Sequence, residues 1–231
     1  MRLGIMQPYF LPYIGYFQLI NAVDKYVIYD NIEYTKKGWI NRNRILMNGQ
    51  DFLISLPLKK DSDHKMVCER ELSSDYHPKK MLEQIKSSYK KAPYFKEVNL
   101  LLESILFSTE TNLFNFIYHS VKAINDFTDI NTEIVVSSTV DIDHQLKSED
   151  KVLAICKALS ADSYYNAIGG KELYSKERFR SAGIDLKFIS SDPIQYQQFN
   201  HDFVPWLSII DVLMFNSKEE VKSMLKKFTL Q

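Results

Sequence analysis

The sequence predicts an α/β fold with a mostly parallel, Rossmann-like sheet and helices on both faces. Short apolar runs typical of strands alternate with segments of helical periodicity near both ends of the chain. Between them, residues 36–130 carry a hairpin signal followed by helical stripes, which predicts a β-hairpin and helical insertion. We therefore expect the 231 residues to form a single α/β domain, 1–231, with 36–130 inserted within it.

The N-terminal segment predicts the first half of a βα unit. Residues 3–6 are apolar, and Pro8 ends this strand because proline has no N–H for the ladder. Gly15 then opens a helix, so the loop between them lies at the carboxyl ends of the strands, where ligands bind in open α/β sheets. The loop and helix start carry one amide and three phenols: Gln7, Tyr9, Tyr13 and Tyr16. Their hydrogen-bonding capacity favours a site, and an aromatic plug is the alternative.

A second strand is predicted at residues 25–30, because it is rich in β-branched and aromatic side chains. It ends at Asp30. A carboxylate at that position is suited to hold magnesium, bind a ribose hydroxyl or accept a proton from a substrate amine, and a turn or helix-cap role is the alternative.

The segment 36–44 combines positive charge, amides and an indole, and it precedes an Asn48-Gly49 hairpin turn. Its candidate site residues are Lys36, Trp39, Asn41, Arg42 and Arg44. Guanidinium groups match phosphate oxygens in pairs, and the two arginines share one face of a strand. We therefore predict phosphate and substrate binding here, with Asn41 orienting the substrate. A solvated edge strand protected by charge is the alternative.

Further elements follow from periodicity and capping signals. Pro78 opens one helix, and Asn112 is the predicted N-cap of another. The later part of the chain alternates between strands at 132–136, 163–166 and 184–189 and helices at 148–159 and 172–182. Gly183 follows the last of these helices as its C′ residue.

Two short motifs near the C-terminal half carry further candidates. Gly169, Gly170 and Lys171 lie between a strand and a helix, where backbone N–H groups and a lysine suit an anion. A tight turn is the alternative, because the P-loop spacing is absent. Ser208 and Asp211 stand at the predicted N-cap and N3 positions of a helix, as an acidic analogue of a capping box.

Composition excludes several classes of protein. The chain has 29 basic and 29 acidic residues, so a general nucleic-acid binder is not expected. Two distant cysteines favour a reducing cytoplasm, and no histidine has a partner at metal spacing, so no metal site is assigned. No signal peptide or apolar run of transmembrane length is present, and we expect a cytoplasmic protein.

Several strings together resemble the WbqC-like protein family, in the expected order and over essentially the whole chain. They are QPYFLPYIGYF, YTKKGWINRNRI, SYKKAPYF, AIGG and FVPWLSIIDVLMFN. The matching positions are Gln7, Pro8, Pro12, Gly15, Asp30, Trp39, Asn41, Arg42, Arg44, Gly169, Gly170, Ser208 and Asp211. The resemblance implies a role in O-antigen or related surface-polysaccharide biosynthesis, with glycine transferase activity suggested for members.

The function expected from this resemblance is aminoacyl (glycine) transfer, or ATP-dependent amide formation, on an amino sugar. Its partners would be an amino acid and a nucleotide-linked or lipid-linked amino sugar, and ATP with magnesium is the candidate cofactor. A non-catalytic sugar-nucleotide-binding subunit is the alternative. A second likeness, of Tyr13-Ile14-Gly15-Tyr16 to the HxGH signature of nucleotidyltransferases, adds nucleotidyl transfer to a sugar phosphate as a third possibility, although tyrosines replace both histidines.

Overall fold

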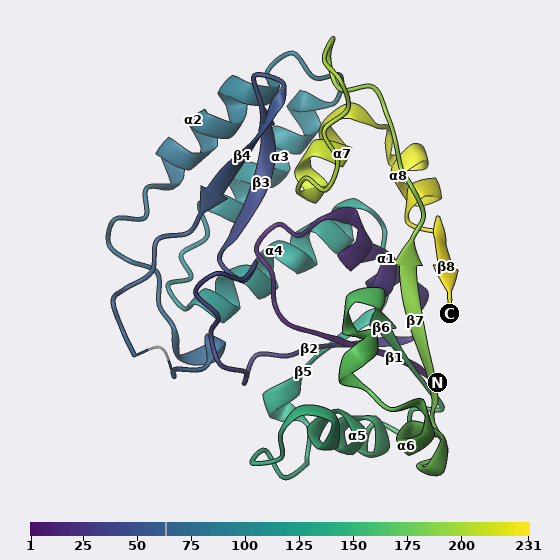
Figure 1. The fold of residues 1–231 in the computed structure, drawn as a ribbon. Helices are drawn as coiled ribbons and strands as arrows, with labels where there is room; N and C mark the ends of the chain where they lie inside the picture. Colours follow the sequence, from purple (N-terminus) through teal and green to yellow (C-terminus); the bar gives the residue numbers. More distant parts are fainter. Residues whose placement is uncertain (63) are drawn as a thin grey trace.

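The computed structural model describes residues 1–62 and 64–231, and its centre is a six-stranded sheet (Figure 1). The strand order is β5-β2-β1-β6-β7-β8, and all neighbours are parallel except β8, which pairs antiparallel with β7. The strands are β1 (Arg2–Met6), β2 (Lys25–Ile28), β5 (Glu133–Val136), β6 (Ser163–Ala167), β7 (Asp185–Ser191) and β8 (Phe228–Leu230). The predicted mostly parallel α/β sheet is confirmed, and β8 is a strand that the sequence did not reveal.

Helices cover both faces of this sheet, as predicted. Helix α1 (Ile14–Ala22) contacts β6 and β7, and its residues share one core cluster with Tyr26 of β2. Helices α5 (Ser148–Ala158) and α6 (Lys176–Ser181) contribute to a second cluster that includes Leu3 and Val27. Tyr26 and Val27 are adjacent, so their presence in different clusters follows from the alternation of side chains along a strand.

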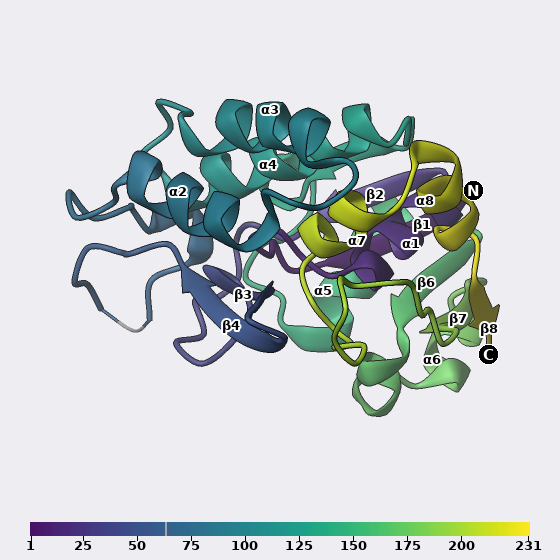
Figure 2. The ribbon, with the colours of Figure 1, turned by 90° about the horizontal axis from the view of Figure 1, so that it is seen from above.

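Between β2 and β5 the chain forms a separate hairpin and three helices. Strands β3 (Arg42–Met47) and β4 (Gln50–Ser55) are joined by Asn48 and Gly49, whose φ angles of 53° and 75° confirm the predicted hairpin turn. The helices are α2 (Pro78–Tyr89), α3 (Phe95–Leu106) and α4 (Leu113–Phe127), preceded by a short 3-10 helix, η1 (Val67–Glu69). Figure 2 shows α2, α3 and α4 gathered on one side of the hairpin.

The remaining helices complete the C-terminal half. They are η2 (Ser137–Thr139), η3 (Ile168–Leu173), α7 (Ile209–Phe215) and α8 (Lys218–Met224). One helix was expected over 172–182, but the chain forms η3 and then α6. The hydroxyl of Ser175 accepts a hydrogen bond from the N–H of Arg178, so a new helix starts there. Gly183, at φ 77°, ends α6 as predicted.

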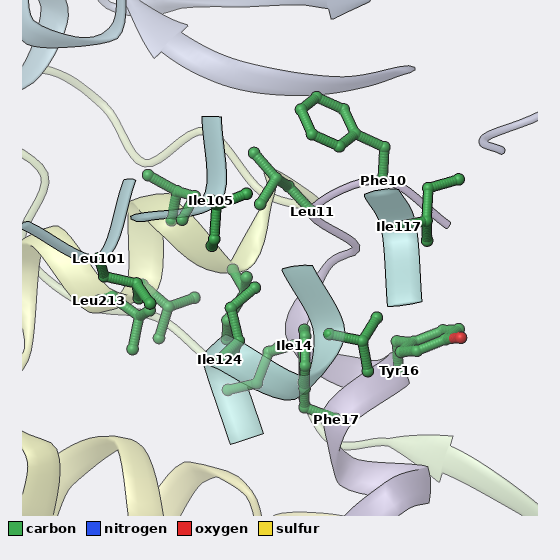
Figure 3. Packing of buried hydrophobic residues seen from close by; sticks show 14 of the residues in the cluster. Phe10, Leu11, Ile14, Tyr16, Phe17, Leu101, Ile105, Ile117, Ile124 and Leu213 are labelled. Atoms are coloured by element: carbon green, nitrogen blue, oxygen red, sulfur yellow. The ribbon is translucent and has the colours of Figure 1, made fainter. Parts of the chain in front are cut away.

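The loop between β1 and α1 lies inside the main core. Phe10 and Leu11 are fully buried, and Figure 3 shows them near Ile105, Ile117 and other apolar side chains of the helices. Burying a side chain of this size contributes about 1.5–3 kcal/mol. The buried apolar residues of the loop that follows β1 therefore fix its backbone. The positions of its polar residues follow from this fixed backbone.

Candidate functional site

The strand order places a topological switch point between β1 and β6. From these two strands the chain continues outward in opposite directions, to β2 and β5 on one side and to β7 and β8 on the other. Ligands of open α/β sheets bind at the carboxyl ends of the strands at such a point. Gln7 follows β1 there, and Asn166 lies near the end of β6. This edge of the sheet is the candidate functional site.

Gln7 is half-buried at this edge and is held by two phenols. The Tyr9 hydroxyl donates to its Oε1 over 3.4 Å, and the Tyr16 hydroxyl donates to its backbone oxygen over 3.1 Å. Tyr9 is half-buried beside it, and burial raises the pKa of its phenol. Tyr16 is different because it is buried against Tyr26, with ring centroids 5.6 Å apart. Of the two phenols, only Tyr9 is exposed to a ligand.

The loop after β1 is fastened to the hairpin and to the start of α7. The Asn43 side chain donates to the backbone oxygens of Phe10 and Leu11 over 3.2 and 2.9 Å, and the Ser208 hydroxyl donates to Leu11 over 2.7 Å. Leu11 has a φ of 44°, an unfavourable conformation for a side chain with a Cβ. Such backbone strain persists where the surroundings over-determine it and is concentrated at functional sites.

Tyr13 and Trp206 form an aromatic pair beside this loop. Their ring centroids are 6.0 Å apart, and Trp206 is 63% exposed with a φ of 60°. Gly15 makes room for the phenol, because a Cβ at this position would lie only 2.3 Å from the Tyr13 ring. Burial raises the pKa of Tyr13, and a hydrogen bond with Ser191 opposes the rise.

The loop before the hairpin contributes an exposed indole near two guanidinium groups of β3. Trp39 is 41% exposed, and the Cζ atoms of Arg42 and Arg44 lie 5.9 and 5.2 Å from its ring centroid. Arg42 donates from Nε to the Gly38 oxygen over 2.9 Å, and Arg44 forms an ion pair of 3.2 Å with Asp51. Both guanidinium groups therefore lie within 5.9 Å of the centre of one exposed indole ring.

A backbone hydrogen bond joins these two aromatic sites. Ser208 N donates to the Arg44 oxygen over 2.8 Å, which brings the segment that carries Trp206 against β3. The chain's two tryptophans are thus each linked to this contact, Trp39 through the Arg44 side chain and Trp206 through its nearness to Ser208 in the sequence. Lys36 is exposed on the loop before Trp39.

Asn41 lies at the base of the hairpin and is hydrogen-bonded there at both ends of its amide. Its Oδ1 accepts a hydrogen bond from the Tyr34 hydroxyl, and its Nδ2 donates to the Leu56 oxygen, each over 2.8 Å. Both ends of the amide are therefore engaged in fixing the base of the hairpin.

Asp30 follows β2 and is only 3% exposed. Its Oδ1 accepts hydrogen bonds from the Ser137 hydroxyl over 2.8 Å and from the Ser138 N–H over 2.9 Å. Its backbone oxygen accepts from the N–H of Cys68 over 3.2 Å. The carboxylate thus fastens the ends of β2 and β5 together. Lys151 of α5, also 3% exposed, lies near it and gave no signal in the sequence beyond its place in a helical segment.

The glycine turn lies on the other side of the switch point, inside the six-residue η3. Gly169 and Lys171 are exposed, which leaves them apart from the buried residues of the site. A Cβ on Gly170 would lie 2.6 Å from Nδ2 of Asn166, so this glycine permits close packing on β6. The anion-binding prediction for this turn stays a prediction.

Asp211 does not complete the capping box that its spacing suggested. Ser208 is the N-cap of α7 as predicted, since its hydroxyl accepts from Ile210 N, but the Asp211 carboxylate is fully buried. It accepts hydrogen bonds from Tyr89 over 2.8 Å and from Tyr196 and Gln198 over 2.6 Å each. Burial raises the pKa of Asp211, and the three donors oppose that rise. The capping interpretation was wrong because its partners are distant in sequence.

Other features of the described residues lie outside this site. No group of three or more His, Cys, Asp or Glu side chains among them is arranged to hold a metal ion. Cys156 is buried in α5, where burial raises its thiol pKa to about 12. A shallow groove of about 840 Å³ runs between α3, α4 and the start of α8, away from the sheet edge. No helix in the described part of the chain is both long and apolar enough to span a membrane.

The strand order and the helices on both faces define an α/β protein with a mostly parallel, Rossmann-ordered sheet. The chain belongs to the WbqC-like protein family, whose sequence profile matches residues 7–223. It is similar to the uncharacterized protein Rv1507c of Mycobacterium tuberculosis, with 26% identity over 228 residues, 97% of each chain. No solved structure matches it.

Proposed function

We propose that this protein is an aminoacyl (glycine) transferase, or an ATP-dependent amide-forming enzyme, that acts on an amino sugar in O-antigen or surface-polysaccharide biosynthesis in the cytoplasm. The observation that supports it best is the pair of exposed tryptophans beside the switch point. Trp39 stacks near two guanidinium groups, and Trp206 stacks near Tyr13. Indole faces suit sugar or base rings, and guanidinium groups suit phosphates, so the surface suits a sugar carried on a phosphate.

The partly exposed side chain of Arg44 supports an anionic ligand here. It is 33% exposed, and its Nη1 forms an ion pair with Asp51. A phosphate oxygen is a strong acceptor for the other donors of a guanidinium group. Arg42, Arg44 and the exposed Lys36 would then bind the phosphates of the substrate or of ATP. Gly169, Gly170 and Lys171 are a second proposed phosphate contact.

Amide formation requires an activated acyl group, so ATP with magnesium or a carrier must supply the driving force. Asp30 would bind the amino group of the amino-acid substrate through Oδ2, because Oδ1 already accepts hydrogen bonds from Ser137 and Ser138. Gln7 and Tyr9 would orient the polar part of the substrate at the end of β1. Asn41 would act indirectly, by fixing the hairpin that carries the guanidinium groups.

One observation favours a non-catalytic sugar-nucleotide-binding subunit instead. Asn41 and Arg42 already hydrogen-bond within the hairpin, so fewer groups are available for chemistry than for binding. Nucleotidyl transfer is less favoured. Tyr16, one of the two tyrosines at the histidine positions of the HxGH-like segment, is buried with its hydroxyl on Gln7.

Intrinsic fluorescence tests the proposed binding site directly, because the only two tryptophans of the chain both belong to it. Titration with UDP-glucosamine should change the emission, and the Trp39→Phe and Trp206→Phe variants should each remove part of the change. Arg44→Ala should weaken binding by about 10- to 100-fold, the loss expected for a charge-assisted hydrogen bond. Arg180→Ala, at an exposed position on α6, is the matched control. An unchanged emission, or equal affinity in Arg44→Ala, would contradict the proposal.

A further inference from the structure

Lys151 lies one turn into α5 and is only 3% exposed. Lysine is rarely buried to this extent unless a carboxylate pairs with it. Here the described chain provides no such ion pair. The ammonium donates one long hydrogen bond of 3.4 Å to the Asn31 backbone oxygen and lies 5.1 Å from the centroid of the Tyr29 ring.

An ammonium group carries three donors, so most of its hydrogen-bonding capacity is unfilled. Burial lowers the pKa of Lys151, and the nearby Asp30 carboxylate opposes this. A buried cation with unfilled donors needs a functional or structural explanation, such as a ligand that completes its shell. It lies near Asp30, which follows β2, and β2 is the neighbour of β1 on one side of the switch point.

Asp30 also has unfilled hydrogen-bonding capacity, and its charge is opposite to that of Lys151. Oδ1 accepts two hydrogen bonds, but no described residue donates to Oδ2. The neighbouring residues Tyr29, Asn31 and Cys68 are half-buried, so the surroundings of this pair are partly accessible to solvent. The Lys151 ammonium therefore has unused donors, and the nearby Asp30 carboxylate has an unused acceptor oxygen.

We propose that Lys151 and Asp30 form a subsite for a small zwitterion, an α-amino acid. The Lys151 ammonium binds the carboxylate of the amino acid, and Oδ2 of Asp30 accepts from its ammonium. A simple anion is repelled by Asp30 and a simple cation by Lys151, whereas a zwitterion satisfies both. The burial of both groups limits the side chain to a small one, for which glycine is the best probe. This inference rests on the proposed function for the identification of the amino acid as the acyl donor.

Thermal unfolding with glycine, acetate or methylammonium tests the subsite. Glycine should raise the midpoint of the wild-type protein, while acetate and methylammonium at equal concentration should not. Lys151→Met and Asp30→Asn should each abolish the glycine response. Lys157→Met changes an exposed lysine on the same helix and should respond as the wild type does. A glycine response that survives in Lys151→Met, or equal responses to acetate and glycine, would overturn the subsite.

The same samples separate this inference from the proposed function. UDP-glucosamine binding, measured by tryptophan fluorescence, should be retained in Lys151→Met, because neither tryptophan contacts that residue in the structure. If UDP-glucosamine binds and glycine does not stabilise any sample, the zwitterion subsite is wrong and the sugar-binding site stands. If glycine stabilises the wild type through Lys151 and UDP-glucosamine does not bind, the failure belongs to the proposed function.

Discussion

Asp211 and Asp30 are both buried carboxylates, but their hydrogen-bond shells differ. Asp211, at 0% exposure, accepts three hydrogen bonds from Tyr89, Tyr196 and Gln198. Asp30, at 3% exposure, has donors on one oxygen only, and the nearby buried Lys151 has one long hydrogen bond. Burial alone therefore does not distinguish a structural charge from one that can meet a ligand. The unfilled hydrogen-bonding capacity does.

The hydrogen bonds to Asp211 connect helices, strands and loops of the fold, and its carboxylate is not presented to solvent. The Tyr89 hydroxyl also accepts a hydrogen bond from Leu46 N over 2.7 Å, so α2, β3 and α7 meet at one carboxylate. Gln198 additionally binds both backbone groups of Val204, which shapes the segment before Trp206. A filled network of this kind fixes geometry, and the edge of the sheet depends on that geometry for the placement of its aromatic residues.

The largest expected effect comes from Asp211→Ala. Removing the carboxylate takes the acceptor from the Tyr89 and Tyr196 hydroxyls and one of two acceptors from the Gln198 amide, and an unsatisfied buried donor costs about 1–3 kcal/mol. We expect a loss of about 3 kcal/mol or more in the free energy of unfolding, seen as a fall of roughly 6–12 °C in the thermal midpoint. Asp202→Ala, at an exposed position in the neighbouring segment, is the control. An Asp211→Ala midpoint close to that of the wild type would remove the distinction between the two regions.

Asn43→Ala should have the next largest effect. The backbone oxygens of Phe10 and Leu11 lose their donor, and we expect a loss of about 2 kcal/mol in urea unfolding. Because the strained loop is released, the affinity for UDP-glucosamine should also fall. If stability falls and affinity does not, the loop is structural and the site lies elsewhere.

Lys151→Met should change stability little, within about 1 kcal/mol of the wild type, because the ammonium contributes so few contacts. The same urea measurement as for Asn43→Ala detects the difference. A loss in the free energy of unfolding comparable to that of Asp211→Ala would show that Lys151 has a structural role. The Asp211 and Asp30 regions would then both be structural.

The smallest expected effect is on the pH dependence of the free energy of unfolding. The folded pKa of Asp211 is raised by burial, so its contribution is fully present below the ordinary pKa of 3.8 and is lost as pH rises through the folded pKa. Relative to an Asp211→Asn variant, the wild type should therefore lose stability as pH increases above about 4. Urea unfolding of both proteins over that range measures the difference, and parallel profiles would show that this pKa is not raised.

Local chemistry made much of the fold predictable. The Asn48-Gly49 turn, the Asn112 N-cap and the Gly183 C′ position are set by neighbouring residues, and all three are found. The burial of Tyr16, the partners of Asp211 and the burial of Lys151 depend on tertiary packing. Asp211 is 122 residues from Tyr89, so its N3 spacing favoured a local cap that the structure replaces with a distant network.

The placement of several candidate site residues was predictable to a similar degree, while their roles stay predictions. Gln7, Tyr9, Tyr13 and Asp30 lie at the carboxyl ends of parallel strands, as a strand followed by a loop predicts. Trp206 was only part of a tail motif in the sequence. It is exposed in a left-handed backbone conformation close to the hydrogen bond between Ser208 and Arg44, and neither feature has a local sequence signal.

The most direct test of the account is product analysis by mass spectrometry after incubating the protein with UDP-glucosamine, glycine and magnesium ATP. We predict a glycyl amide of the sugar that requires the protein and all three small molecules and is lost in Asp30→Asn and Arg42→Ala. Binding of UDP-glucosamine without an amide, including when glycine is supplied on an activated carrier, would contradict the transferase and identify a binding subunit. Pyrophosphate release with a sugar phosphate and a nucleoside triphosphate, without glycine, would identify a nucleotidyltransferase instead.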